Sequence, residues 1–316
     1  MDPITHALVG ANIAGLSGHG MSLSDPLFLG PTLASMAPDL DIIMQFKGDL
    51  AYLKNHRGFS HSLPGVVMIG SATALMLHFL LGGRAPLASL MLLSIAGALS
   101  QSFMDILKSY GVKLLWPLIN KKITFSLLGL VDWVVMGVSL LGVIGTVYYS
   151  SFPVVWACAI TTYFACRFFI AHKVRRYLQL SFSGEGALKQ VVLLPSPFSI
   201  IKWDFLVETT GSFIVGEVLA FSLATKIRQT LQKTKENAFI QAALNSKLGS
   251  LFKDFTPHFH VIHVRGSSRH RVHFMDLRYF SEEDFMHSGM VALDEDCCTL
   301  EEFFQPYSRD RKIRLS

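Results

Sequence analysis

The sequence predicts a mainly α-helical membrane protein with about four transmembrane helices, N-terminal re-entrant or interfacial helices and a small cytoplasmic α+β domain. Of its 316 residues, 51% are hydrophobic and 16% are charged, and the mean hydropathy is +0.41, values that are unusual for a soluble protein. Four apolar stretches have the length of a membrane crossing, and a pattern of short alternating segments follows them. We therefore divide the chain into an N-terminal segment (1–62), a transmembrane bundle (63–171) and a cytoplasmic domain (172–316).

Each of the four stretches offers the roughly 20 apolar residues that a helix needs to cross the hydrocarbon core. They run from Leu63 to Gly82, from Pro86 to Leu107, from Leu127 to Tyr149 and from Phe152 to Ala171. Tight connections around Arg84 and Pro153 predict that the helices they join are antiparallel hairpins.

The distribution of basic residues predicts which side faces the cytoplasm. The loops around Arg84 and Pro153 lie on one side of the membrane and contain a single basic residue, Arg84. The other side carries Lys108, Lys113, Lys121, Lys122 and the basic run from Lys173 to Arg176. The positive-inside rule assigns that side, and with it the C-terminal domain, to the cytoplasm of a multi-pass inner-membrane protein. The formal charge of +5 is thus a sign of topology and of contact with anionic membrane lipid, not of nucleic-acid binding.

The N-terminal segment contains two shorter apolar pieces. Ile4 to Ser17 is too short for a full crossing, so a re-entrant or interfacial helix is the better prediction. Asp2 is placed to cap this helix, and Pro3 suits its first position. A second piece, from Pro26 to Met36, leads into Pro38 and Asp39, and the two pieces are expected to fold over the cytoplasmic mouth of the bundle.

The C-terminal third has the alternation of β-branched and aromatic residues that is typical of strands. Strands are predicted at Val191 to Leu194, Trp203 to Glu208, Ser212 to Ser222, His258 to Val264 and Arg271 to Arg278, with a hairpin turn from Arg265 to Arg269. Thr225 to Phe255 has helical periodicity. Together these segments predict an α+β domain.

Several enzyme classes lack their sequence signatures here. The chain has no HExxH, GxSxG, P-loop or GxGxxG motif, which argues against zincin-type intramembrane proteases, α/β-hydrolases and nucleotide-binding enzymes. The four cysteines, Cys158, Cys166, Cys297 and Cys298, form no spaced framework.

The most informative residues are the polar ones that the membrane half retains. Between His61 and Ile170 the only acids are Asp105 and Asp132, and an ionisable group in a membrane helix is costly and indicates function. Both lie near the predicted cytoplasmic ends of their helices, at the depth to which the N-terminal segment brings His6, Asp39, Asp41, His56, Arg57 and His61. Imidazole and carboxylate groups are ligands of zinc and of harder ions such as manganese or magnesium. This set is therefore sufficient for one or two divalent ions.

Each residue alone has a simpler interpretation. His6 fits an interfacial helix, Asp39 and Asp41 fit a turn after Pro38, and His56 and His61 fit a solvated basic loop. Asp105 could pair with Lys108. The metal interpretation is favoured because the topology places all of them on one face of the membrane.

These residues also carry a family resemblance. His6, the Pro38-Asp39-Leu40-Asp41 element, the His56-to-Ser62 element HRGFSHS and the Asp105-to-Gly111 stretch resemble the YdjM-type family of bacterial membrane-bound metal-dependent hydrolases over roughly residues 1 to 180. One position departs from that family, in which a histidine commonly stands four residues before the Asp; here it is Gln101. A glutamine amide oxygen is a poorer zinc ligand than imidazole, so the departure bears on metal occupancy or activity.

The favoured functional hypothesis is a metal-dependent hydrolase at the inner-leaflet interface. The predicted ligands of a divalent metal ion, zinc or manganese before magnesium, are His6, Asp39, His56, His61 and Asp105. Asp41 is expected to bridge or act as general base, and Arg57 to meet an anionic group of an amphiphilic or phosphorylated small-molecule substrate. The alternative is a non-catalytic protein with a structural metal site and a partner-binding cytoplasmic domain. A transporter is a weaker third option because both acids lie at one end of the bundle.

Histidines are also frequent in the C-terminal domain. They are His258, His260, His263, His270 and His273. Solvent-facing strand positions explain them better than a second metal site does.

Overall fold

The computed structural model describes residues 2–18, 21–48, 52, 56–184, 186–196, 199–266, 269–281, 284–306 and 312–315. It separates into two compact units, which we describe in turn: the first consists of residues 1–172 and 195–200, and the second of residues 173–194 and 201–316.

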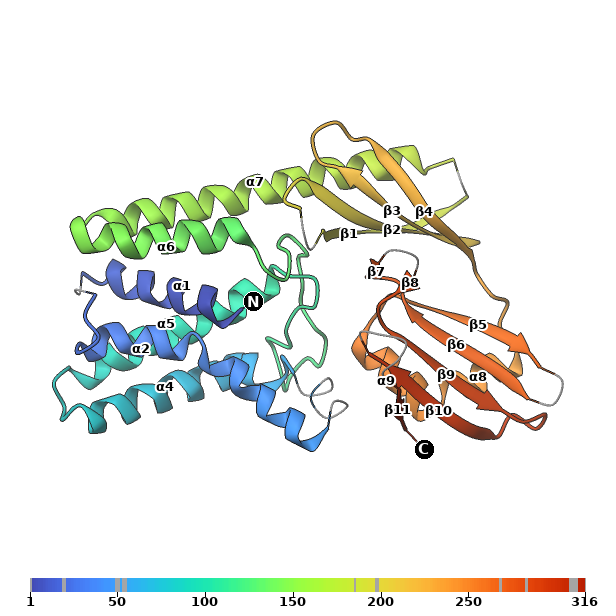
Figure 1. The fold of residues 1–316 in the computed structure, drawn as a ribbon, viewed down its shortest axis with the longest axis horizontal. Helices are drawn as coiled ribbons and strands as arrows, with labels where there is room; N and C mark the ends of the chain where they lie inside the picture. Colours follow the sequence, from blue (N-terminus) through green and yellow to red (C-terminus); the bar gives the residue numbers. More distant parts are fainter. Residues whose placement is uncertain are drawn as a thin grey trace. The chain divides into compact units, whose positions relative to one another are not determined.

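The first unit is helical (Figure 1). Its elements are α1 (Pro3–Leu16), α2 (Pro26–Ala34), the 3₁₀ helices η1 (Ala37–Lys47) and η2 (Phe59–His61), α4 (Leu63–Leu80), α5 (Leu87–Ile106), α6 (Trp133–Tyr148) and α7 (Phe152–Ser181), the last of which continues into the second unit. Helix α1 packs against α2, α5 and α6, and α4 packs against α2 and α5.

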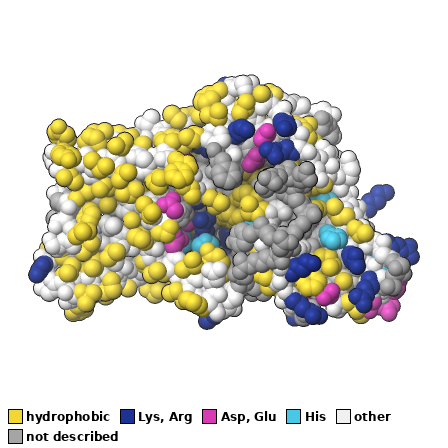
Figure 2. Space-filling view, viewed as in Figure 1, with side chains coloured by type: hydrophobic (Ala, Val, Ile, Leu, Met, Phe, Trp, Pro, Cys, Tyr) yellow, Lys and Arg dark blue, Asp and Glu magenta, His cyan; other side chains and the backbone are white. Residues whose placement is uncertain are grey.

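Among the described residues, three helices are long and apolar enough to cross a membrane: α4, α5 and α7. The pair α2 and η1, bent by 44°, passes the same test as a broken span or re-entrant loop. Figure 2 shows that the visible face of the helical unit is mostly hydrophobic, whereas charged side chains gather over the C-terminal domain. The helical unit thus has the surface of a membrane-embedded body.

The N-terminal helix begins as its sequence predicts. The Asp2 side chain accepts a hydrogen bond from the backbone N–H of Thr5 at 2.9 Å, and Pro3 occupies the first turn. Small residues then bring the helices together: a Cβ at Gly10 of α1 or at Gly97 of α5 would collide with the carbonyl oxygen of Pro31 in α2. Close backbone approach at small residues is typical of helix packing in membranes.

Two predicted helix boundaries are wrong. The third long helix begins at Trp133 and not at Leu127, because the backbone N–H groups of residues 127 and 128 bond to the Leu107 carbonyl and Asp132 caps the helix. At 16 residues α6 is shorter than a full span. Helix α7 runs 30 residues, to Ser181 and not to Ala171.

The second unit is the α+β domain. Its strands are β1 (Leu188–Pro195), β2 (Lys202–Thr209), β3 (Ser212–Leu219), β4 (Thr225–Gln232), β5 (Phe259–Arg265), β6 (His270–Asp276), β7 (Phe280–Ser281), β8 (Asp284–Phe285), β9 (Ser288–Leu293), β10 (Thr299–Gln305) and β11 (Ile313–Arg314), and its helices are α8 (Ala238–Leu244) and α9 (Lys247–Phe255). One sheet has the order β1-β2-β3-β4, a second β11-β10-β9-β6-β5, and a third pairs β7 with β8.

The five-stranded sheet is antiparallel throughout, and α8 and α9 pack on it. Phe252 of α9 lies over this sheet, with ring centroids 5.2 Å from Phe274 and 5.8 Å from Phe304. A separate core of Leu206, Val215, Leu277 and Phe285 contains residues from the four-stranded sheet and from the segment after β6.

The predicted strands in this unit correspond to β1, β2, β3, β5 and β6. The helix prediction for Thr225 to Phe255 is wrong in its first part, which is strand β4 paired with β3. Residues of β4 are largely exposed on both faces, so no alternation of apolar and polar side chains marked it as a strand. The predicted turn from Arg265 to Arg269 closes the β5–β6 hairpin, with Ser267 and Ser268 outside the described residues.

Candidate metal centre

Four elements of the helical unit bring the candidate ligands together. His6 lies one turn into α1, Asp39 in η1, His61 at the end of η2 and Asp105 in the last turn of α5. Ser62 fixes the direction of η2, because its hydroxyl donates to the Phe59 carbonyl and caps α4 by accepting from the Gly65 N–H. The sequence HRGFSHS therefore places His61 directly before the N-cap of α4, with its side chain fully buried.

Asp39, His61 and Asp105 form the core of the site. One ligand atom of each lies within 4.8 Å of the other two. His61 Nε2 is 3.3 Å from Asp39 Oδ1 and 3.4 Å from Asp105 Oδ2. Ligand atoms around a tetrahedral zinc ion are about 3.3 to 3.4 Å apart, since each lies about 2.0 to 2.1 Å from the metal. The two separations from His61 Nε2 therefore fit the coordination of a divalent ion.

His6 adds a fourth donor. Its Nε2 atom lies 3.9 Å from both Asp39 Oδ2 and Asp105 Oδ1. The ring is fully buried, and neither nitrogen has a hydrogen-bond partner among the described residues. A buried polar atom without a partner is costly, and coordination of a metal ion would satisfy it.

Two buried cations also contact Asp105. Lys108 Nζ is 2.7 Å from Asp105 Oδ1, and Arg57 Nε is 3.2 Å from Asp105 Oδ2. Lys108 is fully buried, and Arg57 is 6% exposed. Asp105 therefore does pair with Lys108, as the simpler interpretation predicts. The same carboxylate also faces both histidines.

Asp41 organises the loop that carries His61. Its carboxylate accepts hydrogen bonds from the Arg57 backbone N–H at 3.0 Å and the Ser60 hydroxyl at 3.1 Å, and lies 2.8 Å from His56 Nδ1. Ser60 Oγ is also 3.0 Å from His61 Nδ1. Groups that hold the far nitrogen of a ligating histidine orient its ring, so Asp41 and Ser60 act on the site through His61.

Arg57 has an unusual backbone conformation. Its φ is +60°, a region that residues with a Cβ seldom adopt and that often marks functional sites. The Asp41 bond to its N–H holds this conformation, and the guanidinium carbon lies 5.8 Å from the centre of the Tyr110 ring.

The surroundings of His61 shift its pKa. Burial alone would lower the pKa, but the carboxylates of Asp105 and Asp39 favour the charged ring, so the pKa of His61 is raised above its usual value. A proton therefore competes with a metal ion for Nε2.

The structure brings four of the five predicted ligands together: His6, Asp39, His61 and Asp105. The fifth, His56, lies against Asp41 and stacks on Tyr52, with ring centroids 4.6 Å apart. Gln101, one turn before Asp105, is fully buried, and neither of its amide atoms has a hydrogen-bond partner among the described residues.

Two residues at the site were not predicted as functional. Lys108 was interpreted as a topology signal and as a partner of Asp105, and Ser60 only as part of the HRGFSHS element. The spacing of Lys108, three residues after Asp105 and just past the end of α5, was the available signal, since a long side chain at that point reaches back over the last turn.

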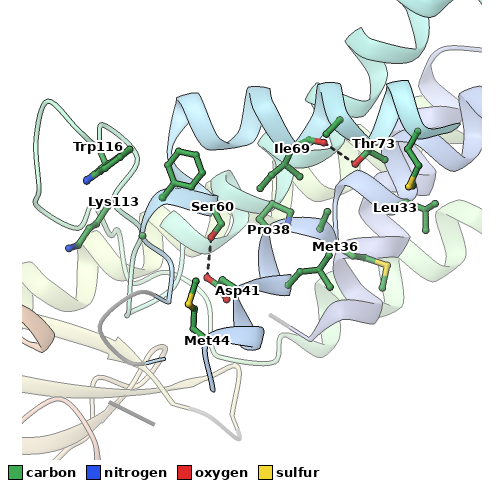
Figure 3. Close-up of a pocket in the computed structure, with 16 residues that line it drawn as sticks. Leu33, Met36, Pro38, Asp41, Met44, Ser60, Ile69, Thr73, Lys113 and Trp116 are labelled. Atoms are coloured by element: carbon green, nitrogen blue, oxygen red, sulfur yellow. Dashed lines mark hydrogen bonds between the residues drawn. The ribbon is translucent and has the colours of Figure 1, made fainter. Parts of the chain in front are cut away.

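A large apolar cavity adjoins the site. Its volume is about 860 Å³, and it lies between α2, η1, η2 and α4 (Figure 3). Asp41 and Ser60 line it, and so does Pro38, the neighbour of Asp39. The side chain of Asp39 is 18% exposed, whereas those of His61 and Asp105 are fully buried.

Comparisons with known proteins agree with this division of the chain. The family model of the YdjM inner membrane protein matches residues 1–174, and that of the YfhP C-terminal alpha/beta plait domain matches residues 238–314, in agreement with the predicted α+β domain. The chain is 22% identical over 306 residues to "Uncharacterized protein YfhP" of Bacillus subtilis (strain 168), covering 94% of this chain and 92% of that protein. No solved structure matches the chain.

Proposed function

Because the chain belongs to the YdjM inner membrane protein family, we propose that it is a membrane-bound metal-dependent hydrolase acting at the inner-leaflet interface. The observation that carries this proposal is the convergence of Asp39, His61 and Asp105, with His6 beside them, at the ends of apolar helices. A mixed imidazole and carboxylate set suits zinc or manganese, and magnesium less well.

The residues have separate tasks in this proposal. His6, Asp39, His61 and Asp105 hold the divalent ion, which supplies Lewis acidity and lowers the pKa of water. Asp41 and Ser60 keep the His61 ring in place. Asp41 also lines the cavity, and we assign it the role of general base toward the water molecule that attacks the substrate.

The charges of the site favour an anionic substrate. Asp39, Asp41 and Asp105 carry one negative charge more than Arg57 and Lys108 supply, so a divalent ion leaves an excess of one positive charge in a largely buried place. Uncompensated buried charge is strongly unfavourable. Arg57 Nη1 is buried without a hydrogen-bond partner among the described residues, and a guanidinium group suits phosphate oxygens. A phosphoester substrate would supply both the charge and the acceptor.

The competing proposal is a structural metal site beside a partner-binding domain. It is favoured by the burial of His6, His61 and Asp105, since structural sites are closed and catalytic sites keep an open position. The partial exposure of Asp39 and the adjoining cavity favour the catalytic proposal.

The test combines elemental analysis with a screen of phosphoester and lipid substrates on the purified protein. We expect His61→Ala and Asp39→Ala to lose both metal and hydrolysis. His78→Ala, which alters a histidine of α4 that is not a predicted ligand, is the control and should retain both. Unchanged metal content in the first two variants would refute the site. Bound metal without hydrolysis of any anionic ester would favour the structural alternative.

The proposed location is the inner membrane with the C-terminal domain in the cytoplasm, as the basic residues predict. A reporter fused after Arg176 tests it. A cytoplasmic signal is expected, and a periplasmic signal would reverse the topology.

A further inference from the structure

The cavity beside the metal centre has an apolar wall inside the membrane-spanning region. Ile69, Ala72, Thr73 and Met76 of α4 line it. Their spacing of i, i+3, i+4 and i+7 places them on one face of the helix. From Ile69 to Met76 the helix rises by about 10 Å, at about 1.5 Å per residue, so the cavity follows α4 for roughly two turns.

The opposite wall comes from α2 and η1. Leu33, Met36, Leu40 and Met44 line it (Figure 3). Several lining side chains are also exposed, including Leu40 at 61% and Met76 at 50%. Met76 lies on α4, which has membrane length, and Leu40 on η1, which has it only together with α2. Exposed apolar residues on such elements face lipid, so the cavity is continuous with the lipid-facing surface. Unbranched methionine side chains suit a flexible chain, because they repack at low cost.

The other end of the cavity is polar and adjoins the site. Asp41, Ser60, Lys113 and Trp116 line it, and the Trp116 ring lies edge-on to Phe59 at a centroid distance of 5.3 Å. Tryptophan and lysine are typical of the headgroup level of a membrane. Apolar and polar ends thus follow each other along the cavity, as the two ends of an amphiphile do.

We propose that the cavity holds a hydrocarbon chain of a lipid whose phosphate headgroup reaches the metal centre. The inference rests on the proposed hydrolase function and narrows its substrate class to phosphate-bearing lipids. Charge complementarity selects the occupant: Lys113 at the polar end and the cations around Asp105 match a phosphate, and an apolar cavity of about 860 Å³ lies within the 300 to 1,000 Å³ common for ligand sites. A diacyl phosphatidic acid and a prenyl phosphate share this chemistry.

The experiment uses photo-crosslinking in nanodiscs that contain the full-length, metal-loaded protein. Three probes carry a diazirine near the end of the chain: a phosphatidic acid, a prenyl phosphate and a phosphatidylcholine. Ala72→Trp fills the cavity. Leu75→Trp is the matched control, because Leu75 lies on the same helix, is 40% exposed and does not line the cavity. Mass spectrometry locates the crosslinks, and elemental analysis follows the metal in every sample.

We expect crosslinks of a phosphate-bearing probe to concentrate on Ile69, Thr73 and Met76, and to fall at least fivefold in Ala72→Trp but not in Leu75→Trp. The phosphate probe that gives the higher crosslink yield shows whether the bound chain belongs to a diacyl lipid or to a prenyl phosphate. Equal labelling by phosphatidylcholine, or labelling spread over the lipid-facing surface and unaffected by Ala72→Trp, would overturn the inference. Crosslinks in the cavity of a protein without metal would count against the hydrolase and not against the lipid site. Bound metal in a protein that shows no crosslinks in the cavity would count against the lipid site and not against the hydrolase.

Discussion

Asp105 and Asp132 are the two acids between His61 and Ile170, and the structure gives them different surroundings. Asp132 caps α6: its carboxylate accepts from the N–H groups of Val134 and Val135, at 3.2 and 3.1 Å, and from the Tyr163 hydroxyl at 2.9 Å. Asp105 faces Lys108, Arg57 and two histidines. Backbone N–H groups and a phenol thus satisfy the Asp132 carboxylate, whereas ionisable side chains surround that of Asp105.

The difference shows what distinguishes a structural acid from a functional one in this fold. A carboxylate saturated by local N–H donors stabilises a helix end. A carboxylate shared by two cations and two imidazole rings can exchange its partners when a metal ion or a substrate binds. Burial alone does not separate them, since Asp132 is 7% exposed and Asp105 is fully buried.

The largest expected effect is on metal binding, when Asp105 but not Asp132 is replaced by the corresponding amide. Asp105→Asn combined with Lys108→Met keeps the charge balance and should weaken metal binding by more than about 100-fold, because a ligand is lost. Asp132→Asn should leave metal binding unchanged. Elemental analysis and chelator competition measure both. Equal metal loss in the two variants would contradict the assignment of Asp105 as a metal ligand and of Asp132 as a structural cap.

The pH dependence of metal binding is the next largest effect. Binding needs a neutral His61, and the raised pKa of this ring keeps it protonated to a higher pH than usual. The metal affinity should therefore fall as the pH drops below that pKa, by about tenfold per unit for one released proton. Chelator titrations between pH 5 and 9 measure it. Asp132→Asn should give the same profile, and a flat profile would argue against His61 as a ligand.

Lys108→Met tests the role of the buried ammonium group. Lys108 Nζ contacts the Asp105 carboxylate, so its removal should not weaken metal binding, but it lowers the positive charge offered to a phosphate. We expect KM for a phosphoester to rise about tenfold, the cost of one charge-assisted contact. Steady-state kinetics measure it. An unchanged KM with unchanged metal content would assign Lys108 a purely structural role.

Gln101→His should strengthen metal binding, whereas the variants above weaken it or leave it unchanged. It places an imidazole one turn before Asp105, in a buried position where the amide has no hydrogen-bond partner among the described residues. Metal affinity should increase roughly three- to tenfold, because imidazole is the better ligand for zinc. Chelator competition measures the change, and unaltered affinity would place this residue outside the coordination sphere.

The smallest effect is expected at the structural acid. Tyr163→Phe removes the hydroxyl that donates to Asp132, and should lower the free energy of unfolding by about 1 to 2 kcal/mol. Thermal unfolding in detergent measures it, with metal content as the control. A change in metal content would link the Asp132 cluster to the site.

The C-terminal histidines show where sequence reasoning failed. Solvent-facing positions were expected, but His260 and His270 are only 5% and 3% exposed. His270 Nδ1 lies 2.9 Å from His263 Nε2, and the Phe239 ring stacks on His270 with centroids 3.7 Å apart. Alternation along a strand states which side chains share a face, but not which face another element covers.

The sequence by itself determined the membrane class, the cap of α1 and the candidate ligands. Apolar length, capping residues and retained polar residues are local properties that can be read along the chain. Only the tertiary structure decided which donors share a point, that His56 contacts Asp41, that Lys108 is buried at Asp105, and that a cavity runs along α4. These features depend on distances between segments that are far apart in the chain, and no local pattern encodes such distances.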